Sequence, residues 1–473
     1  MMLYNLVVDG LETKVTLDEE NLRFEANGTE STKSTSYPFD DIIGCEEIVT
    51  GWFWKTEITR VWVIEHGSSN LLLKKCRDVS GDKRKRFQHD LSDKIANETK
   101  RPKRVLVLIN PIGGNGTAMV DFRNIVKPVF SLSGISMDII VSEHHGHLSD
   151  VANTYDFTNT DGVVLFGGDG TCYQVVNVLM RKRQEEQGVD INDQNSSLSP
   201  LNIPISLIPT GSRNQWAASF TGNQDVLTAA LHVVKGRTVS SHLLAIYSDD
   251  RLLSFACASI TYGFLRDIVY YSDRFRWMGR MRYRFVSLWL LLIKSHTQHV
   301  YDATVTFYTP VTEQHNTENN ETEIFVGGKK LSGYSSYTSD TVVFNRKVWE
   351  LFILSGNLIF DSCVVQDFSR MFAPKLTTFS SIIIYATIPV GSVRRFFNNI
   401  QLMTPLDIRS NEMEVVNARG LSVEIPERFE DMQPSMKALM SVMLPDGEKC
   451  ELKHPSFQIW YKYDVVQIFS SYL

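Results

Sequence analysis

The sequence predicts an α/β nucleotide-binding domain with a Rossmann-like parallel sheet, followed by an antiparallel β-sandwich and preceded by a small β-rich module. From Val105, short apolar runs alternate with glycine-rich turns and helical stretches, which is typical of a parallel sheet covered by helices. After Gly236, strand-like runs follow one another, which favours antiparallel sheets. We place the three parts at residues 1–100, 101–240 and 241–473.

Composition excludes several classes of protein. A length of 473 residues suits two or three domains, and 43% hydrophobic residues suit a large buried core. The net charge of −6 argues against a nucleic-acid binder that relies on bulk electrostatics. The six cysteines form no CxxC pair, which argues against a zinc ribbon and fits a reducing compartment.

No secretory signal is visible at the start, and the longest apolar run, residues 286–293, is too short to span a bilayer. We therefore expect a cytoplasmic protein whose membrane contact is peripheral. The sequence leaves the oligomeric state open.

Residues 1–100 read as short strands bounded by turn pairs such as Asp9-Gly10. They end in a charged helix at 84–98 with a sparse apolar stripe. Strands followed by one helix resemble a pleckstrin-homology domain, in element order alone. The basic run from Lys100 to Arg104 is expected to be a solvated linker.

The α/β part opens with an apolar strand, Val105–Ile109, which runs into a loop rich in glycine and asparagine and then a helix. Exposed N–H groups at such a helix start favour a phosphate. The loop lacks the Gly-Lys-Ser/Thr of a Walker A motif, and an ordinary tight turn is the alternative. The next strand, Met137–Val141, ends at Ser142, another polar group at a carboxyl end.

The third strand of this part, 163–167, leads into Gly168, Asp169 and Gly170 and then a helix. At the carboxyl end of a parallel strand, a carboxylate among glycines can approach a ligand closely. The alternative is an aspartate that only caps a helix. A fourth strand, 205–208, ends near Gly211 and Ser212, so four successive strand ends predict a nucleotide-sized cleft.

The β-rich second half holds an arginine-rich stretch from Arg266 to Arg284. It is either a solvated basic face or a set of guanidinium groups that reach phosphate oxygens. Near the end, Asp446-Gly447-Glu448 is either an ordinary turn or a carboxylate pair that holds Mg²⁺.

Five motifs occur in order: VLVLINPIGGNG (105–116), FGGDGT (166–171), IPTGSRNQWAASF (208–220), YGFLRDIVYYSDRFRWMGRMRYRF (262–285) and PDGE (445–448). Together they resemble the diacylglycerol-kinase-like lipid kinases, in their sphingosine and ceramide kinase branch. The resemblance implies ATP as co-substrate, Mg²⁺, a lipid held by the β-sandwich, and phosphoryl transfer in the cleft between the two domains.

Carried over by motif, the resemblance assigns roles to single residues. Asp169 would orient or deprotonate the lipid hydroxyl, and Asp446 would approach the metal. The lipid would contact Asp169, Phe264, Asp267, Met371 and Phe372. ATP would contact Asn110, Pro111, Ile112, Gly113, Gly114, Ser142, Gly168, Gly170, Gly211, Ser212, Arg276, Arg282, Asp446, Gly447 and Glu448.

The motifs point to two lipids. Residues 217–220 and 371–374 look like sphingosine kinases, which favours sphingosine. Val269 stands where sphingosine kinases usually have a second aspartate, and the β-rich start resembles ceramide kinases. The alternatives are a ceramide kinase, a non-catalytic lipid-binding scaffold and an NAD kinase, which shares Gly-Gly-Asp-Gly. Two departures from the family pattern, Asn115 and Arg213, affect the nucleotide loops.

Overall fold

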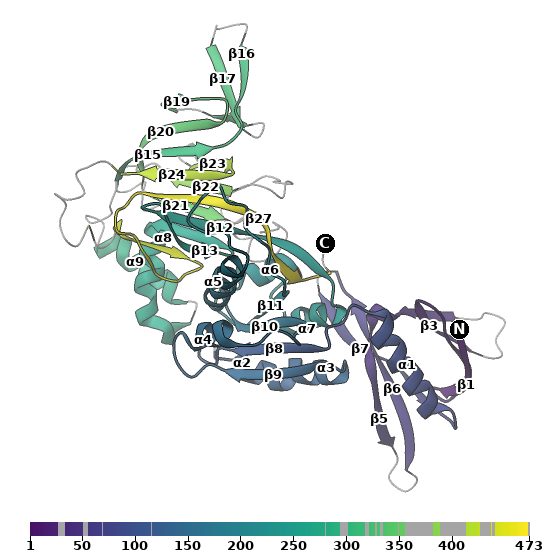
Figure 1. Ribbon diagram of the computed structural model, residues 1–473. Helices are drawn as coiled ribbons and strands as arrows, with labels where there is room; N and C mark the ends of the chain where they lie inside the picture. The colour runs from purple at the N-terminus through teal and green to yellow at the C-terminus, as the bar shows by residue number, and fades with distance from the viewer. Residues whose placement is uncertain are drawn as a thin grey trace.

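The computed structural model describes residues 1–26, 34–50, 55–68, 70–114, 116–279, 281–293, 301–316, 321–326, 329–331, 334–348, 350–354, 382–387, 413–425, 437 and 440–471. Figure 1 shows an N-terminal β module (purple) at one end, an α/β region beside it, and antiparallel sheets beyond (green and yellow). The fold is therefore mixed α/β.

The N-terminal module is one antiparallel sheet in the order β4-β3-β2-β1-β7-β6-β5, followed by a helix. Phe87, Leu91 and Ile95 of that helix are buried against the sheet, so the predicted apolar stripe is confirmed. The elements are β1 (Met2–Val8), β2 (Leu11–Leu17), β3 (Asn21–Ala26), β4 (Ser34–Pro38), η1 (Phe39–Asp41), β5 (Ile42–Thr50), β6 (Thr56–His66), β7 (Leu71–Ser80) and α1 (Arg84–Glu98).

The α/β region holds four parallel strands in the order β9-β8-β10-β11. The three inner strands β8, β10 and β11 are buried almost throughout, as expected where helices cover both faces, whereas the edge strand β9 is only partly buried. The strands are β8 (Arg104–Ile109), β9 (Ser136–Val141), β10 (Gly162–Gly167) and β11 (Ile205–Pro209). The helices are α2 (Ala118–Asp121), η2 (Phe122–Val126), α3 (Lys127–Leu132), α4 (His147–Thr154), α5 (Asp169–Glu186), α6 (Gln215–Thr221) and α7 (Val226–Lys235).

This strand order creates a switch point. The chain leaves β8 toward β9 on one side and returns to β10 on the other side of β8. The loops after β8 and β10 therefore run in opposite directions from the carboxyl ends of their strands. This leaves a crevice between the loops, where ligands bind in open α/β sheets. The order places the Asn110 loop and the Asp169 turn next to each other, as the sequence predicts.

The last long strand, β27 (Phe457–Phe469), joins the parallel strands to the antiparallel ones. It pairs parallel with β11 and antiparallel with β12 (Thr238–Ser248) and β24 (Gly420–Glu424), so one sheet runs through both regions. The other strands of this sheet are β13 (Arg251–Ala256), β15 (Tyr301–Tyr308), β19 (Ser336–Tyr337) and β20 (Thr341–Val348).

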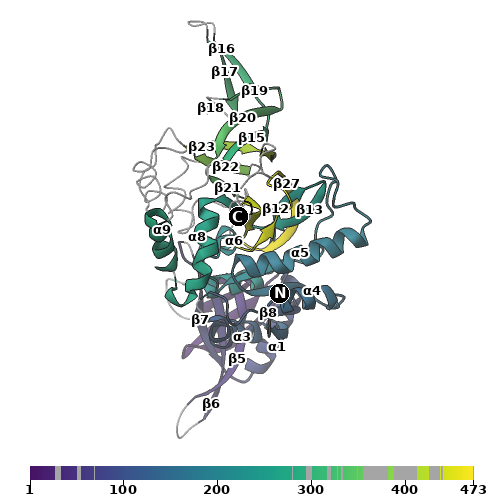
Figure 2. The ribbon, with the colours of Figure 1, turned by 90° about the vertical axis from the view of Figure 1, so that its left-hand side faces the viewer.

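A second antiparallel sheet packs near it and carries the helices α8 (Phe264–Ser272), η3 (Asp273–Met278) and α9 (Met281–Ile293) on one side (Figure 2). Its strands are β14 (Ser259–Gly263), β21 (Glu350–Leu354), β22 (Ile382–Thr387), β23 (Met413–Ala418), β25 (Val442–Pro445) and β26 (Cys450–Glu451). A small outer sheet holds β16 (Thr312–Asn316), β17 (Glu321–Val326) and β18 (Lys329–Leu331). None of the described helices is long and apolar enough to cross a membrane.

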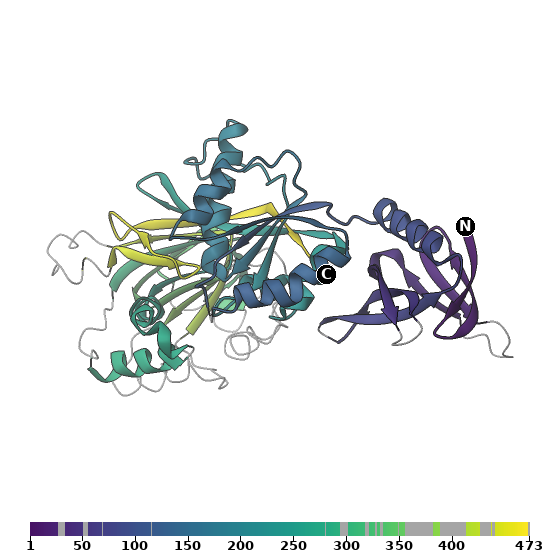
Figure 3. The ribbon, with the colours of Figure 1, turned by 90° about the horizontal axis from the view of Figure 1, so that it is seen from below.

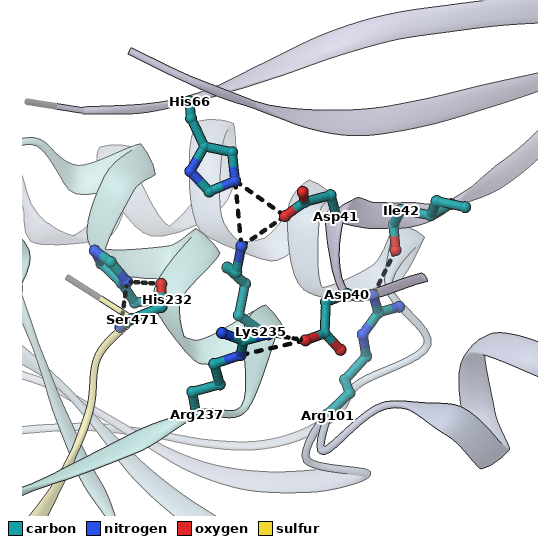
Figure 4. A network of polar contacts seen from close by, with 9 residues as sticks. All are labelled: Asp40, Asp41, Ile42, His66, Arg101, His232, Lys235, Arg237 and Ser471. Atoms are coloured by element: carbon teal, nitrogen blue, oxygen red, sulfur yellow. Dashed lines mark hydrogen bonds and ion pairs between the residues drawn. The ribbon is translucent and has the colours of Figure 1, made fainter. Parts of the chain in front are cut away.

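The N-terminal module is attached to the α/β region through charged contacts around α7 and the start of β5 (Figure 4). Lys235 Nζ lies 2.6 Å from Asp41 Oδ1, and His66 Nε2 lies 3.1 Å from the same oxygen. Arg237 pairs with Asp40. Figure 3 shows the module at one end, next to the C-terminus, where Ser471 N donates to His232 Nδ1.

The prediction of a solvated linker at 100–104 is wrong for Arg101. Its guanidinium donates to the backbone oxygens of Ile42, Ile43, Ser133 and Val234, where β5 begins and where α3 and α7 end. Helix carboxyl ends attract a cation, because their last carbonyls lack partners within the helix. Burial lowers the pKa of Arg101 to about 10. The linker therefore fastens the module to the α/β region.

Candidate functional site

The loops after β8, β9, β10 and β11 and residues of the second half enclose a cavity of about 700 Å³. A volume of this size is typical of a small-molecule site. The cavity is lined by Asp169 and by all but one of the residues assigned to ATP from the motifs: Asn110, Pro111, Ile112, Gly113, Gly114, Ser142, Gly168, Gly170, Gly211, Ser212, Arg282, Asp446, Gly447 and Glu448. Their roles stay predictions, but the structure brings them together.

Glycines let three of these loops touch backbone to backbone. A Cβ atom at Gly211 would lie 2.3 Å from Gly168 Cα, and one at Gly114 would lie 2.2 Å from Thr210 O. Gly114 also has a φ of +59°, which side chains rarely adopt. The glycines are therefore required for the loops to meet, and they leave bare backbone facing the cavity.

Asp169 lies in the first turn of α5, and its carboxylate faces the start of α6. Asp169 Oδ2 accepts from Gln215 N at 3.1 Å, and Oδ1 accepts from Trp216 N at 2.9 Å. The side chain thus caps a helix, as the alternative interpretation expected, but a different helix from its own. Since Asp169 also lines the cavity, capping fixes the carboxylate at the wall of the cleft.

Burial raises the pKa of Asp169, while the N–H groups of Trp216 and Gln215 and the charge of Arg213 lower it. A carboxylate with a raised pKa accepts a proton more readily than one in water. This environment suits a group that takes a proton from a bound hydroxyl.

Asp446, in the turn after β25, is buried, and its carboxylate is bound by backbone N–H groups of the protein interior. Its carboxylate accepts from the backbone N–H groups of Cys257, Ala258 and Ser259 at 2.6–2.9 Å, and it ties this turn to the start of β14. Burial and the charge of Asp169 raise its pKa to about 7, against the three N–H donors. The same turn places Glu448 beside Gly170: a Cβ atom added at Gly170 would lie 2.4 Å from Glu448 Oε1.

The opposite wall of the cavity comes from α9. Arg213, in the loop after β11, and Arg282 lie over the Tyr283 ring at 4.9 and 4.8 Å from its centroid. Arg282 Nε is buried and has no hydrogen-bond partner among the described residues. A buried guanidinium N–H without a partner fits a phosphate oxygen in the cavity.

Sequence reasoning treated Arg213 only as a departure from the family pattern, and it missed Tyr283. Stacking between a loop and a helix 70 residues apart leaves no local signal, because it depends on the tertiary fold. The arginine-rich stretch was the only signal that pointed to this wall.

Asp267 lies outside the residues that line the cavity, on α8. Its Oδ1 accepts from Arg266 Nε at 2.9 Å and from Arg266 Nη2 at 2.8 Å, and Arg266 is buried. Met371 and Phe372 lie outside the described residues, as do the side chains of Phe264 and Arg276. The lipid-contact prediction therefore keeps Asp267 as its one described residue besides Asp169.

Among the described residues, no three His, Cys, Asp or Glu side chains are grouped to hold a metal ion. Mg²⁺ does not need such a group in phosphate chemistry, since phosphate oxygens and water supply most of its ligands. Asp169 and Asp446 are buried close enough for the charge of one to raise the pKa of the other. Both residues line the cavity, and the Mg²⁺ site stays a prediction.

Comparisons with known proteins agree with this geometry. Residues 104–246 match the family model of the diacylglycerol kinase catalytic domain. Human ceramide kinase is 30% identical over 293 residues, which cover 62% of this chain and 51% of that protein. Human sphingosine kinase 1 is 31% identical over 192 residues, which cover 39% of this chain and 47% of that protein.

Sphingoid long-chain bases kinase 1 of Arabidopsis thaliana is 29% identical over 197 residues, or 41% of this chain and 24% of that protein. The chain thus spans about half the length, or less, of these relatives. A solved structure of a putative diacylglycerol kinase from Bacillus anthracis is similar at 14% identity and a TM-score of 0.49, covering 78% of this chain and 98% of that one. By its catalytic-domain match and its relatives, the chain is similar to the sphingosine and ceramide kinase branch of the diacylglycerol-kinase-like family.

Proposed function

We propose that this protein is an ATP-dependent lipid kinase that phosphorylates the primary hydroxyl of a sphingoid lipid. The observation that carries the proposal is the position of Asp169, fixed by the start of α6 at the wall of a cavity lined by glycine loops and arginine. Residues 101–240 would bind the nucleotide, and residues 241–473 would hold the lipid in an antiparallel sandwich. The chain's relatives support the same class of reaction.

In the proposed reaction, the loops at Gly114, Gly168 and Gly211 cradle the phosphates with backbone N–H groups. Asp169 accepts the proton of the lipid hydroxyl as the hydroxyl oxygen bonds to the γ-phosphorus. The bond from that phosphorus to the β–γ bridging oxygen breaks, and ADP leaves with the electron pair. Charge spreads over the transferred group during this step, so nearby cations accelerate it.

Arg282 and Arg213, which both lie over the Tyr283 ring, supply two of these cations. Asp446 and Glu448 would hold Mg²⁺, which would supply positive charge to offset the negative charge of the phosphates. The bare cavity backbone, the buried Arg282 Nε and the two carboxylates all fit a magnesium nucleotide.

Two lipids fit the proposal. The motif at 217–220 favours sphingosine, whose ammonium needs a carboxylate partner. The pairing of Asp267 with Arg266 favours ceramide as the second candidate, because a carboxylate already bound to a guanidinium is a weak counter-ion for an ammonium. A neutral amide head group makes no such demand.

Purified protein with γ-labelled ATP and Mg²⁺, offered sphingosine, ceramide, diacylglycerol and NAD separately, tests the proposal. We expect label in sphingosine or ceramide and far less in the other two. Label in NAD or diacylglycerol alone would replace the proposed acceptor. The absence of transfer to all four, with ATP bound, would favour the lipid-binding scaffold instead.

A further inference from the structure

Strand β14 turns two polar side chains toward the cavity. Side chains alternate along a strand, so residues on one face are two positions apart. Ile260 and Tyr262 are buried in the core that the two antiparallel sheets share. Ser259 and Thr261 face the other way and line the cavity. The cavity therefore has a hydroxyl-bearing wall that comes from the second half of the chain.

The hydroxyl of Thr261 is buried without a partner. Thr261 is 4% exposed, and its Oγ1 makes no hydrogen bond within the described part of the chain. Among the buried polar atoms in this condition there, only Thr261 Oγ1 and Arg282 Nε belong to residues that line the cavity. A buried polar group without a partner costs stability, and a bound ligand is one reason to keep it. Since Arg282 Nε fits a phosphate oxygen, Thr261 Oγ1 is available to a different group of the reactants.

Thr261 lies close to the expected position of the acceptor hydroxyl. Ser259 Oγ lies 3.4 Å from Gln215 Oε1, and Gln215 N donates to Asp169 Oδ2 at 3.1 Å. Ser259 N also donates to Asp446 Oδ1. Thr261 is two residues further along the strand, which is about 7 Å. A lipid hydroxyl at Asp169 therefore brings groups that are attached a few bonds away within reach of Thr261.

Two aliphatic side chains accompany Thr261 in this wall. Leu444 lies directly opposite Thr261 on β25, and Val269 comes from α8, which packs against β14; both line the cavity. A threonine hydroxyl donates to a carbonyl oxygen or accepts from an amide N–H, and it carries no charge. An ammonium that leaves water needs a counter-ion, which a hydroxyl does not supply. This part of the wall therefore suits a neutral amide better than an ammonium.

We propose that Thr261 is a specificity-determining residue, whose hydroxyl binds the amide of an N-acylated amino alcohol beside the hydroxyl that Asp169 engages. The inference deepens the proposed function and rests on it for the reaction. Thr261 contacts the acceptor but none of the transferred atoms, so it acts on the choice and the affinity of the acceptor. Without an acceptor its hydroxyl is unpartnered, a cost in stability that the acceptor amide removes.

Three variants of the full chain test this role in the presence of γ-labelled ATP and Mg²⁺. Thr261→Val removes the hydroxyl and keeps the shape of the side chain, while Thr261→Ser keeps the hydroxyl. Tyr247→Phe is the matched control, because the Tyr247 hydroxyl is also buried without a partner among the described residues but lies outside this cavity. Thr261→Val should raise the KM for N-hexanoyl-sphingosine about five- to tenfold and leave kcat and the KM for ATP nearly unchanged. The other two variants should stay within about twofold of wild type, as should the KM of all three for sphingosine.

Binding of N-hexanoyl-sphingosine in the presence of a non-hydrolysable ATP analogue measures the same contact without turnover, and Thr261→Val should weaken it by the same factor. The midpoint of thermal unfolding should be equal or higher in Thr261→Val, because the variant removes a buried hydroxyl that has no partner in the free protein. A lower midpoint would assign the hydroxyl to the fold and overturn the inference.

The inference is also overturned if Thr261→Val binds N-hexanoyl-sphingosine like wild type, or if Thr261→Ser or Tyr247→Phe loses as much. Equal weakening toward sphingosine, or a wild type that does not bind N-hexanoyl-sphingosine, would contradict it too. A wild type that binds this lipid, loses it in Thr261→Val and transfers phosphate to neither lipid would refute the proposed reaction and support the contact. The two failures are therefore distinguishable.

Discussion

Replacing Asp169 with asparagine should abolish most lipid phosphorylation at a small cost in stability. In the wild type, the two carboxylate oxygens accept from Gln215 N and Trp216 N at 3.1 and 2.9 Å. An amide keeps one acceptor and turns an NH₂ group toward the other N–H, which leaves a buried donor without a partner, at about 1–3 kcal/mol. Removal of a desolvated carboxylate offsets part of this cost, because burial raises the pKa of Asp169.

The effect on activity should be larger. A positioned proton acceptor contributes about 10²–10⁴-fold to the rate, so turnover should fall by that factor while the affinity for ATP stays nearly unchanged. Asp161→Asn is the matched control, since Asp161 also accepts from two backbone N–H groups, but near the amino end of β10. Turnover with labelled ATP and chemical unfolding of both variants check the prediction. Wild-type turnover in a folded Asp169→Asn protein would refute the role of Asp169.

Three further predictions follow from the same geometry. Gly211→Ala should weaken ATP binding at least about tenfold in calorimetry, because its Cβ would lie 2.3 Å from Gly168 Cα; unchanged affinity would contradict the loop contact. Lys235→Met should lower the free energy of unfolding by about 1–3 kcal/mol, since it leaves the half-buried Asp41 without its closest cation. Arg237→Gln, at a more exposed pair, should cost under about 1 kcal/mol, and equal losses would argue against the difference in burial. Burial lowers the pKa of His232 from 6.5 to about 4, so neutral His232 contributes to the stability of the fold above pH 6.5, and this contribution is lost as pH falls toward 4. Between pH 7 and 5, the free energy of unfolding of the wild type should therefore fall by about 2 kcal/mol more than that of His232→Gln. Parallel pH curves of the two proteins would contradict this prediction.

The parallel sheet and its glycine turns were predictable because their signals are local. Short apolar runs bounded by turn residues, such as Val105–Ile109, indicate buried strands, and the residues that follow a parallel strand reach its carboxyl edge. The helix at 84–98 was predictable for the same reason, from three apolar residues at helical spacing. The order of the strands then brings Asn110 and Asp169 to one cavity.

Features that depend on distant contacts could not be predicted. The sequence cannot show that Arg101 meets the ends of two helices, or that Asp446 accepts three N–H groups from a turn nearly 190 residues earlier. It also could not show that β27 would join the parallel strands and the antiparallel strands into one sheet, because its pairing partners lie far apart in the chain. From sequence alone, charged residues such as these are predicted to be solvent-exposed, because their hydrogen-bond partners become apparent only in the folded structure.

A structure of the protein with a non-hydrolysable ATP analogue and Mg²⁺ would be the most direct examination of the proposed cleft. We predict that the terminal phosphate lies between the Gly168 and Gly211 turns, close to the Asp169 carboxylate, with Arg282 Nε on a phosphate oxygen. A nucleotide bound outside this cavity, or one whose terminal phosphate points away from Asp169, would contradict the account.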